Sequence, residues 1–258
     1  MNENKSFWAT VPGILTGIGT VIAAITGLYI ALHPPKSTDT PSSLSATPSS
    51  TVATTIDPGP PTWPLVAEET FTKNGSGWTA GSFTYNGIPR FDIRVTDGAY
   101  RWDISFSKAL RSGRVYVPYG AMVNFAAGID LKIADNTDEV AASMHIGDSS
   151  DQLYSFNISS NGYFSLTRTI PNSMETEGDL IGWTPISFKS GIKFDPKSWN
   201  RMMIVANDQL IKLYINSELQ GEFRDVEFRG GKVGLSVEMF KQGSSVVDFD
   251  NFKLSRKP

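Results

Sequence analysis

The chain has 258 residues, of which 40% are hydrophobic and 19% are charged, so its composition excludes a wholly disordered protein. A net charge of −3 excludes a global basic field that would draw the protein to nucleic acid or to anionic lipid. The absence of cysteine excludes disulfides and thiolate metal sites, and two histidines leave little scope for acid–base and metal chemistry.

The N-terminus consists of a short tail, residues 1–10, followed by an apolar segment, residues 11–33. No charged residue occurs between Ser6 and Pro35. As a helix, the apolar core would be about 33 Å long, enough to cross a hydrocarbon layer of about 30 Å. A cleaved signal peptide is the alternative, but its apolar region is usually ~7–15 residues long. The segment therefore predicts one transmembrane helix.

Small residues recur at every fourth position of this segment, at Gly19, Ala23 and Gly27. Such spacing lets two helices approach closely in lipid, so it predicts a homodimer through this stripe. The general abundance of Gly and Ala in membrane helices is the alternative explanation.

Residues 34–64 are dominated by Ser, Thr and Pro and have almost no large apolar side chains. Such a segment cannot form a core, so we expect a disordered linker. A single early span before a large domain usually leaves that domain outside. We therefore expect a single-pass plasma-membrane protein with an extracytoplasmic C-terminal domain.

Residues 65–258 change to a period of two, which is typical of half-buried β-strands. The hairpin from Trp199 to Asn216, with its turn at Asn207-Asp208, predicts that Ile211, Leu213 and Ile215 face a core. Further strands are expected at residues 91–95, 102–106, 123–133, 140–146, 154–158, 163–168, 233–240 and 246–254, with Asp97-Gly98 as one of the turns. No amphipathic helix is evident. The pattern predicts an all-β, two-sheet antiparallel sandwich.

Four pieces of this region, in order, resemble one family. They are Glu69-Thr70-Phe71 with Ser76-Gly77-Trp78, the run 154–164, the hairpin from Trp199 to Leu219, and Phe249-Asp250-Asn251-Phe252-Lys253-Leu254. The family is that of the concanavalin A-like lectin/glucanase jelly rolls of bacterial surface proteins, including the group described as 3-keto-disaccharide hydrolase-like or laminin-G-like. The resemblance implies two stacked, curved sheets and frequent carbohydrate binding.

A glycosidase of this fold would carry paired carboxylates on one strand. The family's Glu-x-Asp-x-x-Glu type of pattern is absent, and Asp248 with Asp250 is the one geometrically plausible pair. We expect these two to face water or to cap a turn, so no residue is assigned a catalytic role. His145 is expected to be a hydrogen-bonded edge histidine at the end of a strand.

Structural calcium is the one cofactor that the chain suggests, because jelly rolls often use it and hard cations need several oxygen ligands. Asp250, with Glu69 on a strand that pairs beside it, is one candidate site. The loops with Asp135 and Asp138, and with Asp148 and Asp151, are the others.

Carbohydrate binding requires exposed aromatic rings and planar polar side chains. The candidate ligand-binding residues are Tyr116, Tyr119, Tyr154, Tyr163 and Trp183. Trp78, Trp102 and Trp199 are expected to fill the core instead.

We expect the domain to be a non-catalytic module that binds a glycan or a protein at the cell surface, without a nucleic-acid partner. A glycoside-processing enzyme of the 3-keto-disaccharide hydrolase-like group is one alternative. A structural or sensory ectodomain of an envelope complex is another. Fold alone does not decide among them.

Overall fold

A computed structural model describes residues 59–73, 77–85, 88–106, 111–134, 140–147, 152–169 and 178–258. The predicted membrane helix at 11–33, its Gly19, Ala23 and Gly27, and most of the linker lie outside the described residues. Within the described ranges, no helix is long and apolar enough to span a membrane. Every regular element described there is a β-strand, which confirms the all-β prediction.

The larger sheet, sheet A, has the strand order β13-β12-β11-β6-β15-β4-β3-β2, and β1 pairs beside β15. All its pairings are antiparallel. Its strands are β1 (Leu65–Glu69), β2 (Gly81–Tyr85), β3 (Ile88–Thr96), β4 (Ala99–Phe106), β6 (Phe125–Ile133), β11 (Asn200–Asn207), β12 (Leu210–Ile215), β13 (Glu218–Arg224) and β15 (Gly243–Arg256).

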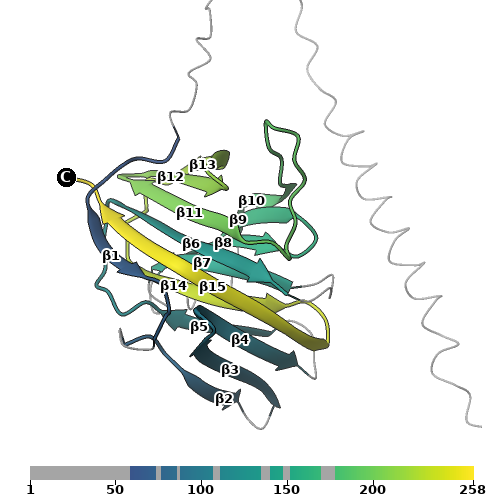
Figure 1. The fold of residues 1–258 in the computed structure, drawn as a ribbon. Coiled ribbons are helices and arrows are strands. Elements are labelled where there is room, and N and C mark those ends of the chain that lie inside the picture. The colour runs from purple at the N-terminus through teal and green to yellow at the C-terminus, as the bar shows by residue number, and fades with distance from the viewer. Residues whose placement is uncertain are drawn as a thin grey trace, which may run out of the picture. The chain divides into compact units, whose positions relative to one another are not determined.

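The smaller sheet, sheet B, has the order β10-β9-β8-β7-β14-β5 and is also antiparallel throughout. Its strands are β5 (Arg111–Tyr116), β7 (Val140–Gly147), β8 (Leu153–Ser159), β9 (Tyr163–Thr169), β10 (Gly178–Pro185) and β14 (Lys232–Met239). The two sheets form successive layers in Figure 1, with the long yellow strand β15 crossing the front layer. The predicted two-sheet sandwich is therefore confirmed.

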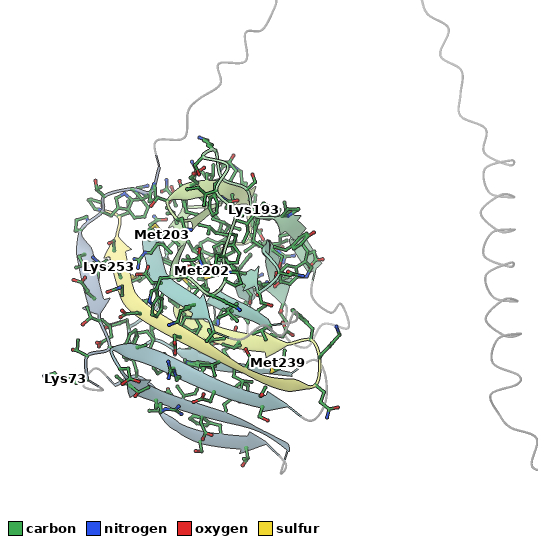
Figure 2. The ribbon with its side chains drawn as sticks, turned by 45° about the vertical axis from the view of Figure 1, so that its right-hand side comes forward. Lys73, Lys193, Met202, Met203, Met239 and Lys253 are labelled. Carbon is green, nitrogen blue, oxygen red and sulfur yellow. The ribbon has the colours of Figure 1, made fainter. Side chains whose placement is uncertain are left out.

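The core lies between the sheets and follows the alternation of the strands. Ile211, Leu213 and Ile215 are completely buried in it, as the hairpin pattern predicts. Met202 from β11 and Met239 from β14 are buried there as well (Figure 2).

Tight turns with left-handed residues connect the strands. Asp97 (φ 53°) and Gly98 (φ 72°) form the predicted turn between β3 and β4. The turn of the β11–β12 hairpin falls at Asp208-Gln209, one residue later than expected, and Asp208 has a φ of 55°. Asp tolerates this backbone conformation, so the shift costs little.

Trp199 does not belong to the core, so the prediction that it fills the core is wrong. Its side chain is 45% exposed, and Nζ of Lys132 lies 4.8 Å from the centre of its ring. Trp78 and Trp102 are buried as predicted. Trp199 immediately precedes β11, where the strand alternation puts it on the outer side of sheet A.

The outer face of sheet A, which we call the ion-paired face, is held together by charges. Asp248 is 1% exposed, and its carboxylate accepts hydrogen bonds from Nε (2.7 Å) and Nη2 (3.0 Å) of Arg101. Nζ of Lys132 lies 3.4 Å from the same carboxylate. Asp248 therefore neither faces water nor caps a turn, because two cations on neighbouring strands enclose it.

Candidate functional site

The outer face of sheet B differs from that of sheet A in chemistry. On each central strand, alternate residues such as Met144, Phe156 and Leu235 enter the core, so their neighbours point outward. The outward side chains are Arg114, Tyr116, Ala141, Ser143, His145, Ser155, Asn157, Ser159, Tyr163, Ser165, Thr167, Lys232, Ser236 and Glu238. Hydroxyl, amide and imidazole groups therefore dominate this face.

One aromatic contact shows that sheet B curls toward this outer face. Trp183 belongs to β10 and Phe240 follows β14, and β9, β8 and β7 lie between them. In a flat sheet these strands would be about 19 Å apart at ~4.8 Å per strand. The ring centroids are 5.9 Å apart, with the rings nearly perpendicular. Neither ring belongs to the core, so they meet over the outer face, which we call the concave face.

Three side chains form a hydrogen-bonded row across the concave face. Oγ of Ser143 on β7 donates to Oδ1 of Asn157 on β8 at 2.7 Å. Nδ2 of Asn157 donates to Oγ of Ser165 on β9 at 3.0 Å. All three are buried, so the row holds the amide of Asn157 in one orientation.

His145 lies on the same strand as Ser143 and corrects a second expectation. Its strand is central, its side chain is completely buried, and neither Nδ1 nor Nε2 has a hydrogen-bond partner. The ring lies over the backbone of Gly234, and its centre is 5.1 Å from that of Tyr116. Burial, and secondarily the charge of Arg114, lowers the pKa of His145 to about 3. The imidazole is therefore neutral at physiological pH.

This pKa predicts an acid-sensitive stability. The unfolded chain takes up a proton on His145 below about pH 6.5, whereas the folded chain does so only near pH 3. Wild-type stability therefore falls between these pH values. We expect His145→Leu to gain roughly 2–3 kcal/mol relative to wild type between pH 7 and pH 4, measured by urea unfolding at each pH.

Met144→Leu is the matched control, because it conserves volume on the opposite face of β7 and should keep the wild-type pH profile. Parallel profiles for wild type and His145→Leu would contradict the buried, neutral state of this histidine.

The predicted ligand-binding residues separate into two groups. Tyr116 and Tyr163 lie on the concave face, and Trp183 reaches over it. Tyr119 stacks on Phe252 instead, with its ring centre 6.0 Å away. Burial and then the charge of Glu69 raise the pKa of Tyr119, which places it on the side of Glu69. Three of the five residues thus share one surface.

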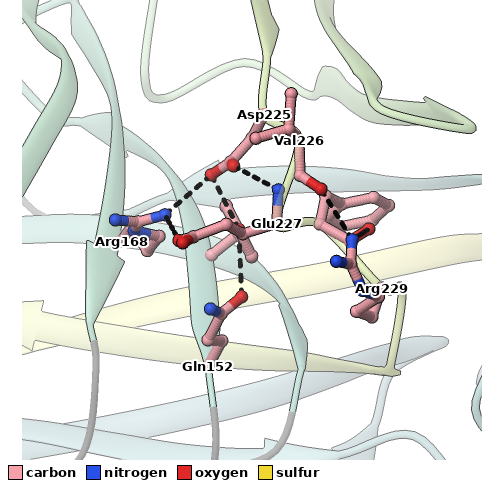
Figure 3. A network of polar contacts seen from close by, with 8 residues as sticks. Gln152, Arg168, Asp225, Val226, Glu227 and Arg229 are labelled. Atoms are coloured by element: carbon pink, nitrogen blue, oxygen red, sulfur yellow. Dashed lines mark hydrogen bonds and ion pairs between the residues drawn. The ribbon is translucent and has the colours of Figure 1, made fainter.

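Tyr154 is the fifth, and it is a core residue that offers no open ring face. Its hydroxyl donates to Oδ2 of Asp225 at 2.8 Å, and Nη1 of Arg168 lies 3.0 Å from the same oxygen (Figure 3). The backbone N–H of Glu227 donates to the other oxygen of Asp225 at 2.8 Å. This network ties the segment between β13 and β14 to sheet B.

The predicted calcium site lies elsewhere, beside β1 and β15. Burial, and then the charges of Asp130 and Glu69, raise the pKa of Asp250, so these carboxylates lie near one another. One oxygen of Glu69 accepts the backbone N–H of Phe71 at 2.9 Å. Among the described residues, no three acidic or histidine side chains converge as a metal site would require. Calcium at Asp250 and Glu69 stays a prediction, and the loops with Asp135 and Asp148 lie outside the described residues.

Solved structures resemble this domain, although no family model and no curated protein matches the chain. A Bacillus licheniformis β-glucanase is 11% identical over 76% of this chain and 100% of its own, with a TM-score of 0.53. The κ-carrageenase of Pseudoalteromonas carrageenovora, solved with an oligosaccharide of κ-carrageenan, is 12% identical over 81% and 100%, with a TM-score of 0.54. A structure described with endo-acting O-glycanases of the human gut microbiota, which initiate mucin breakdown, is 7% identical over 75% and 100%, with a TM-score of 0.55.

These similar proteins are enzymes that cleave glycans. They contradict the prediction that the domain is a non-catalytic binding module. The glycoside-processing alternative has the better support. At these identities the likeness itself establishes architecture alone. Residues 65–258 therefore have the concanavalin A-like jelly-roll fold.

Proposed function

We propose that this domain is an enzyme that cleaves glycosidic bonds of a glycan bound on the concave face of sheet B. The observation that carries the proposal is the curvature of this sheet, which brings Trp183 and Phe240 together over a surface of hydroxyl and amide groups. Aromatic rings stack on the C–H faces of sugars, and the polar groups bind their hydroxyls. The glycan-cleaving neighbours support the same reading.

Cleavage of a glycosidic bond requires a proton for the departing oxygen, which a carboxylic acid usually supplies. The described strands of sheet B direct two carboxylates toward the concave face, Glu238 on β14 and, at the far edge of the sheet, Asp179 on β10, which pairs with Thr167. Glu238 lies two residues before Phe240 on β14, opposite Ala141 of β7. The methyl group of Ala141 is small, so it leaves space beside Glu238 on the side of β7. We assign the proton transfer to Glu238.

We expect Glu238→Gln to lower glycan cleavage by a hundredfold or more, because general acid–base catalysis contributes about 10²–10⁴-fold. The measurement is the release of reducing ends from β-1,3-glucan, κ-carrageenan and mucin O-glycans by the full-length chain in detergent. Glu222→Gln is the matched control, since Glu222 is exposed and lies on the ion-paired face, 3.9 Å from Nζ of Lys212.

Undiminished cleavage by Glu238→Gln would reject the role of this carboxylate. A wild-type chain that cleaves none of a broad glycan panel would reject the enzyme proposal.

We also propose that residues 11–33 anchor the domain at the plasma membrane, with the domain outside the cytoplasm. The length and apolar composition of that segment support the anchor. Extraction of the chain by alkaline carbonate, or protection of the domain from protease added to intact cells, would contradict the proposal.

A further inference from the structure

Cations on the two outer faces have different partners. On the ion-paired face, Arg94 pairs with Asp103, Arg101 and Lys132 pair with Asp248, and Arg201 pairs with Asp130. On the concave face, Arg114 and Lys232 make no ion pair with any residue in the described part of the chain. An unneutralised cation pair on a sheet surface attracts an anion from solution.

These two cations flank Gly234 of β14, since Lys232 lies two residues before it and Arg114 lies opposite Ser236, two residues after it. Gly234 has no side chain, and its cross-strand neighbours are Tyr116 on β5 and His145 on β7. Nζ of Lys232 lies 5.9 Å from the centre of the Tyr116 ring. Arg114 precedes Tyr116 by two residues on the same face, and its charge acts on His145. We call Arg114, Tyr116, His145 and Lys232 the cationic cluster.

Within the described residues, the two carboxylates of this face, Glu238 and Asp179, form no ion pair with the cationic cluster. Glu238 is two residues from Ser236, which lies opposite Arg114, so the two positions are about 7 Å apart along the strands at ~3.3 Å per residue, yet their side chains do not form an ion pair. In addition, both ring nitrogens of the buried His145 lack partners. A neutral imidazole has one N–H donor, and leaving it unpaired in a buried site is unfavourable unless a ligand supplies an acceptor.

We propose that the cationic cluster binds the anionic group, a carboxylate or a sulfate ester, of an acidic glycan. The guanidinium of Arg114 forms charge-assisted hydrogen bonds to the anion, and Lys232 supplies a second positive charge. His145 donates its N–H once the ring of Tyr116 moves aside. This inference rests on the proposed function, because it assigns a substrate class to the same face.

The test measures binding of oligosaccharides to the full-length chain in detergent by calorimetry, on the Glu238→Gln background so that ligand is not consumed. The probes are a hexagalacturonate, a sulfated κ-carrageenan tetrasaccharide and a neutral laminarihexaose. We expect one of the acidic probes to bind at least tenfold more tightly than the neutral probe, with affinity falling as salt rises. Arg114→Gln and Lys232→Gln should each lower the affinity for that probe roughly tenfold.

Arg94→Gln is the matched control, because Arg94 is a half-exposed arginine on the ion-paired face. Preference for the uronate or for the sulfated probe identifies the anionic group. Equal binding of neutral and acidic probes, unchanged by Arg114→Gln, would overturn the inference even if the chain cleaves a glycan. Selective acidic binding without cleavage of any glycan would support the inference and reject the enzyme proposal.

Discussion

Gly234→Ala is expected to lower the free energy of unfolding by about 3 kcal/mol, because overpacking a well-packed site costs typically 1–3 kcal/mol and occasionally more. A Cβ atom at residue 234 would lie 2.0 Å from Nε2 of His145 and 2.5 Å from the carbonyl oxygen of Val115. The first contact is a fully buried ring and the second is backbone of the neighbouring strand. Neither can move without disturbing sheet B.

Urea unfolding of Gly234→Ala and of Gly243→Ala measures this effect. Gly243 is also a strand residue, but its added Cβ would meet only the terminal methyl of Met239, at an ordinary 3.6 Å. The control should therefore change stability by less than about 1 kcal/mol. Equal stability of Gly234→Ala and wild type would show that the ring of His145 does not occupy the space over Gly234.

Asp225→Ala is expected to lower the free energy of unfolding by about 3 kcal/mol, since it removes three hydrogen bonds at a buried carboxylate. The hydroxyl of Tyr154 and the guanidinium of Arg168 would lose their shared acceptor (Figure 3). Asp225→Asn should cost less, because an amide oxygen can still accept from one donor.

Glu227→Gln is the control for this network, because Glu227 contacts the same Arg168 but has a side chain that is 57% exposed. An exposed ion pair contributes only about 0–1 kcal/mol. If Asp225→Ala and Glu227→Gln unfold at the same urea concentration, the structural role of Asp225 is contradicted.

Acid should weaken this network in wild type. Burial opposes ionisation of Asp225, but the N–H of Glu227, the hydroxyl of Tyr154 and Arg168 outweigh it, so the pKa of Asp225 is lowered. Its contribution to stability is therefore present above about pH 4, the ordinary carboxyl value, and is lost as pH falls through the lower folded value.

Polar residues on the two outer faces of the sandwich differ in whether they have partners within the protein. On sheet A, the buried carboxylate of Asp248 has an oppositely charged neighbour on each adjacent strand, Arg101 on β4 and Lys132 on β6. On sheet B, the two ring nitrogens of the buried His145 lack protein partners in the described part of the chain, although the neighbouring Ser143 and Asn157 are hydrogen-bonded. Complete satisfaction stabilises a scaffold, whereas spare hydrogen-bonding capacity at a curved surface is typical of a ligand site.

Local patterns in the amino-acid sequence are sufficient to predict the strands and their buried sides. Alternation of apolar and polar residues places Ile211, Leu213 and Ile215 in a core wherever the second sheet lies, because the side-chain period of a strand is two. Turn chemistry at Asp97-Gly98 is equally local, since few residues tolerate a positive φ. These features depend on a few neighbouring residues, so sequence reasoning recovered them.

Which polar face is concave, and which side chains meet on it, depends on how the strands pair in the folded domain. Trp183 and Phe240 are far apart in sequence, and the curl of sheet B alone brings their rings together. Asp248 and His145 each follow an ordinary strand alternation, yet one is enclosed by two cations and the other has no partner. An outward-pointing side chain is exposed only when no other side chain covers it. The covering side chains belong to strands that are distant in sequence, so the local pattern does not reveal them.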